Sequence, residues 1–350
     1  MSFPSVLFYA QSGAGKSSLI NAGLIPRLEV QNLKVFSPIR VGVQAPKPSN
    51  VEIRNAYIYN LLRQWDSNTD ATSLADMTLD EFLAQRPHRI DEFGVQRPRV
   101  LIFDQFEELF RSRPVRWEQR KPFFEQVREA LEADSLLRVV FAMRKEYVAE
   151  VDPYTPLLPD KLRVRLQLEL LRRDAALRAI TGPLEVLNIP FDMDAATSLV
   201  DKLLTIDDQE TGERGIGEYV DPVYLQVVCA NVWDSAERTG KNAIDEDIVA
   251  LYGDPAQALG QFYNNCLKNV IESYGLEEKS LREWSERNLI GEDQAYKLRI
   301  VVDAKTGATN GIANEVIERF EDLHLLGDIV DGVRWTELAH DRLVESIKQS

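Results

Sequence analysis

The sequence is poor in cysteine and histidine and has no long apolar run. It contains two cysteines, Cys229 and Cys266, and three histidines among 350 residues. Two isolated cysteines exclude a disulfide framework and a cysteine metal cluster, and we expect buried thiols in a reducing compartment. No apolar stretch approaches the ~20 residues that span a membrane. Because "MSFPSVLFYAQ" at the N-terminus also lacks the basic segment of a signal peptide, we expect a cytoplasmic protein that does not act at a membrane.

Positive charge is scarce as well. The chain has 41 Lys and Arg residues against 56 Asp and Glu residues, which gives a net charge of −15 at pH 7. This balance argues against broad binding of nucleic acid or anionic membranes, since both rely on clustered basic residues. The apolar share of 44% and the charged share of 28% are those of an ordinary globular protein. A chain of this length accommodates two or three domains.

The first strong motif lies in "VLFYAQSGAGKSSLINAGLIPRL", residues 6–28. The apolar run at 5–9 is typical of a strand buried in a parallel sheet, and a helix is predicted after the Gly-rich loop. A strand, a loop and a helix N-terminus form the context that a P-loop requires. Gly13 and Gly15 let backbone N–H groups turn towards a phosphate, and the helix end adds partial positive charge.

Side chains of the same loop supply further contacts. We expect Lys16 to reach the β- and γ-phosphates of a nucleotide and the Ser17 hydroxyl to bind Mg²⁺. The usual pattern G-x-x-x-x-G-K-[ST] begins with Ala10 here, a mild departure because the phosphate-facing glycines come later. A chance Gly-rich turn is the alternative interpretation. The residues expected to hold the phosphates are Ser12, Gly13, Ala14, Gly15, Lys16, Ser17 and Ser18.

A second acidic motif, "PRVLIFDQFEELF" at 98–110, completes the expected metal site. Asp104 stands at the carboxyl end of a buried apolar strand, where open α/β sheets place their ligands, and it is expected to bind Mg²⁺ directly or through water. Glu107 and Glu108 follow within one turn, so one of them can orient or deprotonate the attacking water. The alternative is that both glutamates are solvated acids at a helix start.

A third strand, "LLRVVFAMR" at 136–144, ends in Arg144. An arginine at that strand tip, next to the strand with Asp104, can contact a γ-phosphate; a surface arginine is the alternative. Further strands are predicted within 33–43 and 163–171, and helices between them. This order predicts a doubly wound parallel sheet, the α/β core of a P-loop NTPase.

The sequence after residue 171 predicts two smaller domains. Helical patterns near 172–191, with an expected stop at Gly182-Pro183, and again at 221–237 indicate a helical lid. From about residue 255, helices are followed by two β-rich runs joined by Asp331-Gly332, a hairpin signal that predicts a winged helix. The expected domains are an NTPase core, a helical lid and a winged-helix domain, at residues 1–171, 172–254 and 255–350.

The winged helix is not expected to bind nucleic acid. Its candidate recognition helix, "ANEVIERFEDL" at 313–323, carries four acidic side chains against Arg319 alone. Such a helix repels phosphates and lacks the arginines and lysines that read a major groove. We therefore interpret it as a packing module.

Four segments together resemble a known family. "SGAGKSSLINAGLIPRL", "VLIFDQFEELF", "VVFAMRKEY" and "LRAITGPLE" are similar to the bacterial STAND nucleotidases, signal-transduction ATPases with numerous domains, in their novel STAND branch. The resemblance implies ATP and ADP as ligands, with Mg²⁺. It also implies that Pro183 packs against the adenine, although a helix terminator explains this proline equally well. The final "ELAHDRLVESI" (337–347) is similar to the family's closing motif, in which His340 contacts the β-phosphate of ADP; a locally satisfied histidine near a helix start is the alternative.

The resemblance implies an ATP/ADP-dependent signalling switch. It would hydrolyse ATP slowly, form homo-oligomers in its active state and act with an unidentified effector or sensor protein in bacterial regulation or antiviral defence. Family members have a segment before the P-loop strand that helps to hold adenine, and four residues stand there in this sequence. That difference and Ala10 motivate the alternative of a non-hydrolysing interaction scaffold. A DNA-loading ATPase is disfavoured by the acidic helix, and a GTPase by the lack of an Asn-Lys-x-Asp motif.

Overall fold

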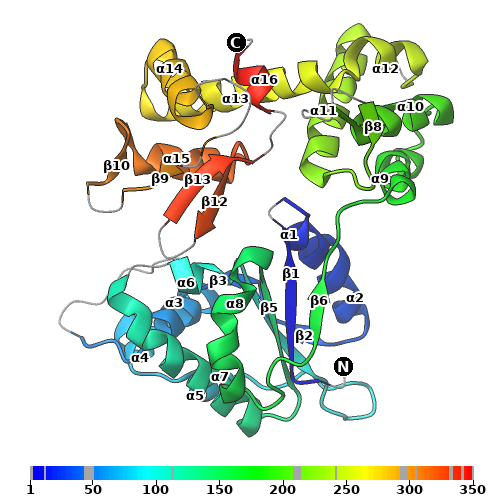
Figure 1. Ribbon diagram of the computed structural model, residues 1–350. Coiled ribbons are helices and arrows are strands. Elements are labelled where there is room, and N and C mark those ends of the chain that lie inside the picture. Colours follow the sequence, from blue (N-terminus) through cyan, green and yellow to red (C-terminus); the bar gives the residue numbers. More distant parts are fainter. Residues whose placement is uncertain are drawn as a thin grey trace. The chain divides into compact units, whose positions relative to one another are not determined.

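The protein is described by a computed structural model (Figure 1). The residues that it describes are 3–11, 13–42, 51–111, 114–207, 214–240, 243–291, 298, 300–303, 306–330, 334–339 and 343–348. The chain divides into two compact units, residues 1–169 and 170–350, and each has a hydrophobic core of its own. The predicted three-part division at residues 171 and 254 stays a prediction.

The N-terminal unit is built on a parallel sheet. Its strands are β1 (Ser5–Ala10), β2 (Lys34–Val35), β3 (Ile39–Arg40), β4 (Arg99–Asp104), β5 (Leu137–Arg144) and β6 (Arg165–Gln167). Their order is β2-β4-β5-β1-β6, with β3 also paired to β4, and every pairing is parallel. The predicted α/β class is thereby confirmed. The order places β5 between the strand that leads into the Gly-rich loop and the strand that ends in Asp104.

The helices of this unit follow from local signals. The first runs from Lys16 to Val30 in three segments, α1 (Lys16–Ser18), the π-helical η1 (Leu19–Leu24) and α2 (Ile25–Val30). Capping side chains begin several others; Asn55, for example, accepts hydrogen bonds from the backbone of Tyr57 and Ile58. The remaining helices are α3 (Ala56–Trp65), α4 (Ala71–Ala75), α5 (Leu79–Ala84), α6 (Glu108–Arg111), η2 (Pro114–Gln119), α7 (Arg120–Ala133), η3 (Lys145–Tyr147), α8 (Val148–Val151) and η4 (Asp152–Leu157).

Helices cover both faces of the sheet because successive strand residues point to opposite sides. On one face, Ile20 and Leu28 of the first helix pack against alternate residues of β4 and β5, namely Val100, Ile102, Val140 and Ala142. On the other face, the intervening residues meet α7 in an aromatic cluster formed by Phe103, Phe106, Phe123, Phe124 and Phe141. The sheet is therefore doubly wound, as predicted.

The C-terminal unit is mainly helical. It contains α9 (Arg173–Val186), α10 (Met193–Leu204), β7 (Thr205–Asp207), β8 (Arg214–Ile216), α11 (Pro222–Thr239), α12 (Glu246–Tyr252), α13 (Pro255–Tyr274), α14 (Glu278–Leu289), β9 (Ile300–Val301), β10 (Ala308–Thr309), β11 (Ile312–Ala313), α15 (Asn314–Asp322), β12 (Leu326–Val330), β13 (Arg334–Leu338) and α16 (Leu343–Lys348). The antiparallel sheet β12-β13-β9, in which β12 and β13 follow α15 and β9 precedes it, forms the wing of the predicted winged helix.

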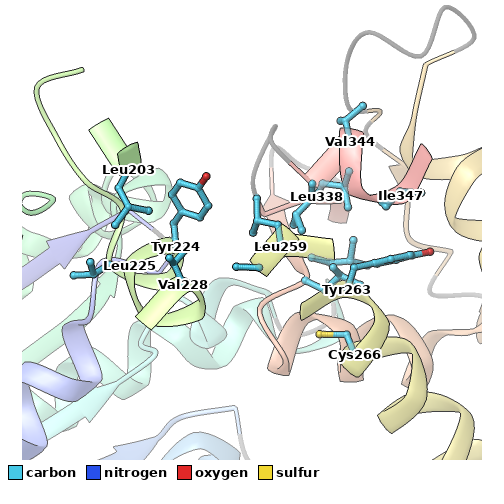
Figure 2. Packing of buried hydrophobic residues seen from close by; sticks show 14 of the residues in the cluster. Leu203, Tyr224, Leu225, Val228, Leu259, Tyr263, Cys266, Leu338, Val344 and Ile347 are labelled. Atoms are coloured by element: carbon cyan, nitrogen blue, oxygen red, sulfur yellow. The ribbon is translucent and has the colours of Figure 1, made fainter. Parts of the chain in front are cut away.

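One apolar core joins these elements. Figure 2 shows Leu259 and Tyr263 of α13 close to Leu338 of β13 and Ile347 of α16, while Leu225 of α11 belongs to the other end of the same cluster. The long helix α13 thus connects the helical part of this unit to the winged helix through apolar contacts. Among the described residues, no helix is long and apolar enough to cross a membrane.

The expected helix stop at Gly182-Pro183 is wrong. Helix α9 continues to Val186 with Pro183 inside it, although a proline in a helix interior costs about 3 kcal/mol. Ile180 before the proline is buried in the core and Leu184 after it packs against the same core. These apolar contacts on both sides of the proline stabilise the continued helix. Local helix-stop signals do not take such tertiary contacts into account.

Candidate functional site

Three neighbouring strands end together at one edge of the N-terminal sheet. In the pairing register Ala10 of β1 lies opposite Arg144 of β5, and Phe103 of β4 lies opposite Phe141 of β5. The Gly-rich loop, the turn after Asp104 and the terminal residue Arg144 of β5 therefore all lie at the carboxyl ends of adjacent strands. This is the edge at which parallel α/β sheets bind ligands.

The Gly-rich loop depends on two glycines in left-handed backbone conformation. Gly13 has a φ of 74° and Gly15 a φ of 87°. A Cβ added at Gly15 would meet no atom within 4 Å, so the backbone conformation, not lack of space, requires glycine there. Gly15 directly precedes α1, and its conformation turns the chain into the helix whose N-terminus favours anions. Ser12, a predicted phosphate contact, lies outside the described residues.

Lys16 is folded against its own loop. Its Nζ donates hydrogen bonds to the carbonyl oxygens of Ala10 and Gln11, both at 3.2 Å. Burial lowers the pKa of Lys16, the carboxylate of Glu107 opposes that shift, and the guanidinium of Arg144 adds to it. A partly desolvated ammonium gains strongly from an incoming anion, as a phosphate-binding lysine requires.

Asp104 closes β4 and is 8% exposed. Its Oδ1 accepts a hydrogen bond from the backbone N–H of Gln105 at 2.9 Å, and Gln105 has a φ of 50°, unusual for a residue with a side chain. Within the described part of the chain, no three His, Cys, Asp or Glu side chains form a metal site by themselves. Mg²⁺ takes one or two protein ligands together with phosphate oxygens, and the carboxylate of Asp104 and the hydroxyl of Ser17 are ligands of that kind.

The buried Glu107 forms an ion pair with the partly buried Arg144. Arg144 Nε lies 3.3 Å from Glu107 Oε1, and the backbone N–H of Arg144 donates to Glu107 Oε2 at 3.2 Å. The glutamate is 3% exposed. Burial raises the pKa of Glu107, while the positive charges of Arg144 and Lys16 oppose the rise. A carboxylate with a raised pKa near a phosphate loop is suited to accept a proton.

Glu108 points elsewhere. Its Oε2 accepts a hydrogen bond from the backbone N–H of Gly42, at 2.9 Å. A Cβ at Gly42 would lie 2.8 Å from both Cβ and Oε2 of Glu108, so the contact requires glycine. Glu107 is therefore the glutamate that the structure places with Lys16 and Arg144, and Glu108 holds the segment after β3. Sequence analysis missed Gly42; its one signal was a glycine inside a predicted strand, which often marks a close backbone approach.

Comparison with known proteins identifies the family. The sequence profile of the novel STAND NTPase 1 family matches residues 2–347. The chain belongs to this family. Comparison with curated protein sequences gives no match. Since the family is one of NTPases, its membership implies that the protein binds nucleotide, and the Gly-rich loop is the feature of this STAND NTPase suited to that role.

Several solved structures are similar to the chain. The ORC2 protein of Aeropyrum pernix, in ADPNP-ADP complexes, is 14% identical with a TM-score of 0.49; the match covers 99% of this chain and 87% of ORC2. A Walker-type ATPase of Pyrococcus abyssi is 15% identical with a TM-score of 0.47, covering 100% and 92%. The Cdc6 protein of Pyrobaculum aerophilum is 12% identical with a TM-score of 0.44, covering 99% and 88%. Similarities at this level carry no information on function.

Two predicted contacts of the STAND NTPase belong to its C-terminal unit. Pro183 lines a largely apolar cavity of about 460 Å³ within that unit, together with Leu184, Phe191, Leu225 and Trp233. The cavity is large enough for an aromatic base, and the adenine contact of Pro183 stays a prediction. His340, the expected contact of ADP, lies outside the described residues.

Proposed function

We propose that this STAND NTPase is an ATP/ADP-dependent switch that binds Mg²⁺-ATP in its N-terminal unit and hydrolyses it slowly. The observation that carries the proposal is the convergence of Lys16, Glu107 and Arg144 beside the Gly-rich loop, with electrostatic coupling among all three. Asp104 lies at the same edge of the sheet. These residue types are those that phosphoryl transfer uses to bind phosphates, hold a metal ion and activate water.

Each side chain has a defined task in the proposed reaction. Lys16 and the loop N–H groups bind the β- and γ-phosphates, and Asp104 and Ser17 hold Mg²⁺, which offsets phosphate charge when bound. Glu107 accepts a proton from a water molecule while the oxygen of that water bonds to the γ-phosphorus. The bond between this phosphorus and the β–γ bridging oxygen breaks, which leaves ADP and phosphate. Arg144 contacts both oxygens of Glu107 and opposes the rise in pKa that burial causes, which moderates the basicity of the carboxylate. Slow hydrolysis itself rests on the family resemblance.

A switch needs contacts that differ between its two nucleotide states. Arg144 is the proposed contact of the γ-phosphate and thus favours ATP. The proposed contact of His340 with the β-phosphate of ADP rests on the family resemblance, as do homo-oligomers in the ATP state, an effector or sensor partner, and a role in bacterial regulation or antiviral defence.

The experiment that tests this function is identification of nucleotide carried by the purified protein. The full chain is purified without added nucleotide and denatured, and the supernatant is analysed by anion-exchange chromatography. Near-stoichiometric ADP supports a switch that rests in its ADP state. An empty protein that also fails to bind added ATP would contradict the proposal and favour a non-hydrolysing interaction scaffold.

A further inference from the structure

The contact between Glu107 and Arg144 has a second consequence for the site. Both oxygens of the carboxylate meet the same arginine, one at its guanidinium and one at its backbone N–H. Two contacts at different points of one residue fix the backbone of Arg144 at the end of β5 and the direction in which its side chain leaves the strand.

The carboxylate itself is held firmly. Phe106, the residue before it, is fully buried, stacks in the aromatic cluster and donates its backbone N–H to the carbonyl oxygen of Ala142 at 2.8 Å. This bond ties the turn that carries Glu107 to β5, the strand that carries Arg144. Glu107 is thus a rigid anchor for the arginine.

The geometry of the guanidinium matters for phosphate. Arginine has five N–H donors in a fixed plane, and Nε carries one of them. An acceptor at Nε therefore sets the plane and direction of the outer NH₂ groups, which are the donors that bind a phosphate in bidentate fashion. Without the carboxylate of Glu107 the guanidinium loses one of the contacts that orient it, and a larger part of its binding energy goes into ordering it on the phosphate.

We infer that Glu107 is a specificity-determining residue as well as the proposed base: by fixing Arg144, it sets the preference of the site for nucleoside triphosphate over diphosphate. The inference rests on the proposed function, because it takes Arg144 as the contact of the γ-phosphate. Glu107→Gln separates two properties of Glu107: the one carbonyl oxygen of glutamine can still face Nε, whereas its NH₂ group replaces the second oxygen and cannot take a proton.

The test measures the ratio of the dissociation constants for ADP and ATP, with Mg²⁺, by titration calorimetry on the full chain. Arg144→Ala and Glu107→Ala are each expected to reduce this ratio by roughly ten- to a hundredfold, as for loss of a charge-assisted contact. Glu107→Gln is expected to keep most of the ratio. In the double variant Arg144→Ala/Glu107→Ala, the ratio falls no further than in Arg144→Ala, because both changes remove one contact.

Two controls make the result decisive. ADP affinity close to that of the wild type shows that each variant folds, and Glu108→Ala, which removes the contact with Gly42, is expected to leave the ratio unchanged. A Glu107→Ala protein with the wild-type ratio would overturn the inference, and so would a wild type that binds ATP and ADP equally. Failure of the wild type to bind either nucleotide would instead contradict the proposed function itself.

Discussion

The two units of the chain differ sharply in charge. Residues 1–169 hold 23 Lys and Arg against 22 Asp and Glu, a net charge of +1, whereas residues 170–350 hold 18 against 34, a net charge of −16. The chain's charge of −15 therefore comes from the C-terminal unit. The unit with the phosphate loop is close to neutral and does not itself repel an anionic nucleotide. The net charge of the whole chain hides this difference between the units.

The two cores differ in kind as well. Every aromatic ring pair found among the described residues lies in the N-terminal unit, with Phe106 in contact with several rings. The C-terminal core consists largely of aliphatic side chains. Paired rings surround the turn of Glu107, whereas aliphatic side chains pack between the helices of the C-terminal unit. The phosphate loop and the aromatic core therefore belong to one unit, and the excess of acidic residues belongs to the other.

The largest expected effect is on nucleotide affinity, at the phosphate loop of the N-terminal unit. Lys16→Ala removes the ammonium at the loop, so nucleotide affinity should fall by more than about a hundredfold, as for loss of charge-assisted hydrogen bonds to phosphate. The matched control is Lys34→Ala, because Lys34 lies on β2, at the opposite end of the sheet, and its Nζ contacts the carbonyl oxygen of Pro87. Titration calorimetry with ADP measures both. Equal affinities in the two variants would contradict the assignment of Lys16 to the nucleotide site.

A pair of core substitutions separates the stabilities of the units. Phe106→Ala and Leu199→Ala each remove a fully buried side chain, the first in the N-terminal unit and the second in the C-terminal unit. Losses of about 3–5 and 2–5 kcal/mol are expected. Differential scanning calorimetry with and without ADP measures them; ADP should raise most the transition that Phe106→Ala lowers, because the phosphate loop belongs to that unit. A single transition that both variants lower equally would show that the units unfold together.

A smaller effect is expected on the pH dependence of stability, through the buried Glu107. Burial raises the pKa of Glu107 above its ordinary value of 4.5, so the folded state binds this proton more readily than the unfolded state. The resulting stability is fully present below the ordinary pKa and is lost as pH rises through the raised value. Glu107→Gln does not titrate. Its melting temperature minus that of the wild type should therefore become more positive between pH 4 and pH 8; a difference independent of pH would contradict the assignment.

The smallest effect is expected at the thiols, which both lie in the C-terminal unit. Burial raises the pKa of Cys229 and of Cys266 to about 12, so thiolate is scarce at pH 7.5 and alkylation is slow at both, most of all at the buried Cys266. Labelling followed by mass spectrometry should be slow in the wild type, unchanged in Phe106→Ala and faster in Leu199→Ala. Faster labelling in Phe106→Ala would show that the cores are coupled.

Much of this fold follows from local patterns. Short apolar runs predict β1, β4 and β5. The Gly-rich loop is assigned from its position after β1, and Asp104 and Arg144 from their positions at the ends of β4 and β5. The choice between Glu107 and Glu108 does not follow, because it depends on the left-handed turn at Gln105 and on partners far away in the sequence. The passage of α9 through Pro183 also escapes prediction, since buried contacts on both sides of the proline override its local preference.

The most direct test of the account is single-turnover hydrolysis of γ-labelled ATP by the wild type and by Glu107→Gln, with protein in excess and Mg²⁺ present. The account predicts slow release of phosphate by the wild type, and bound ATP without phosphate release in the variant. Equal rates of release in the two proteins would contradict the claim that Glu107, held by Arg144 beside the phosphate loop, accepts the proton from the attacking water.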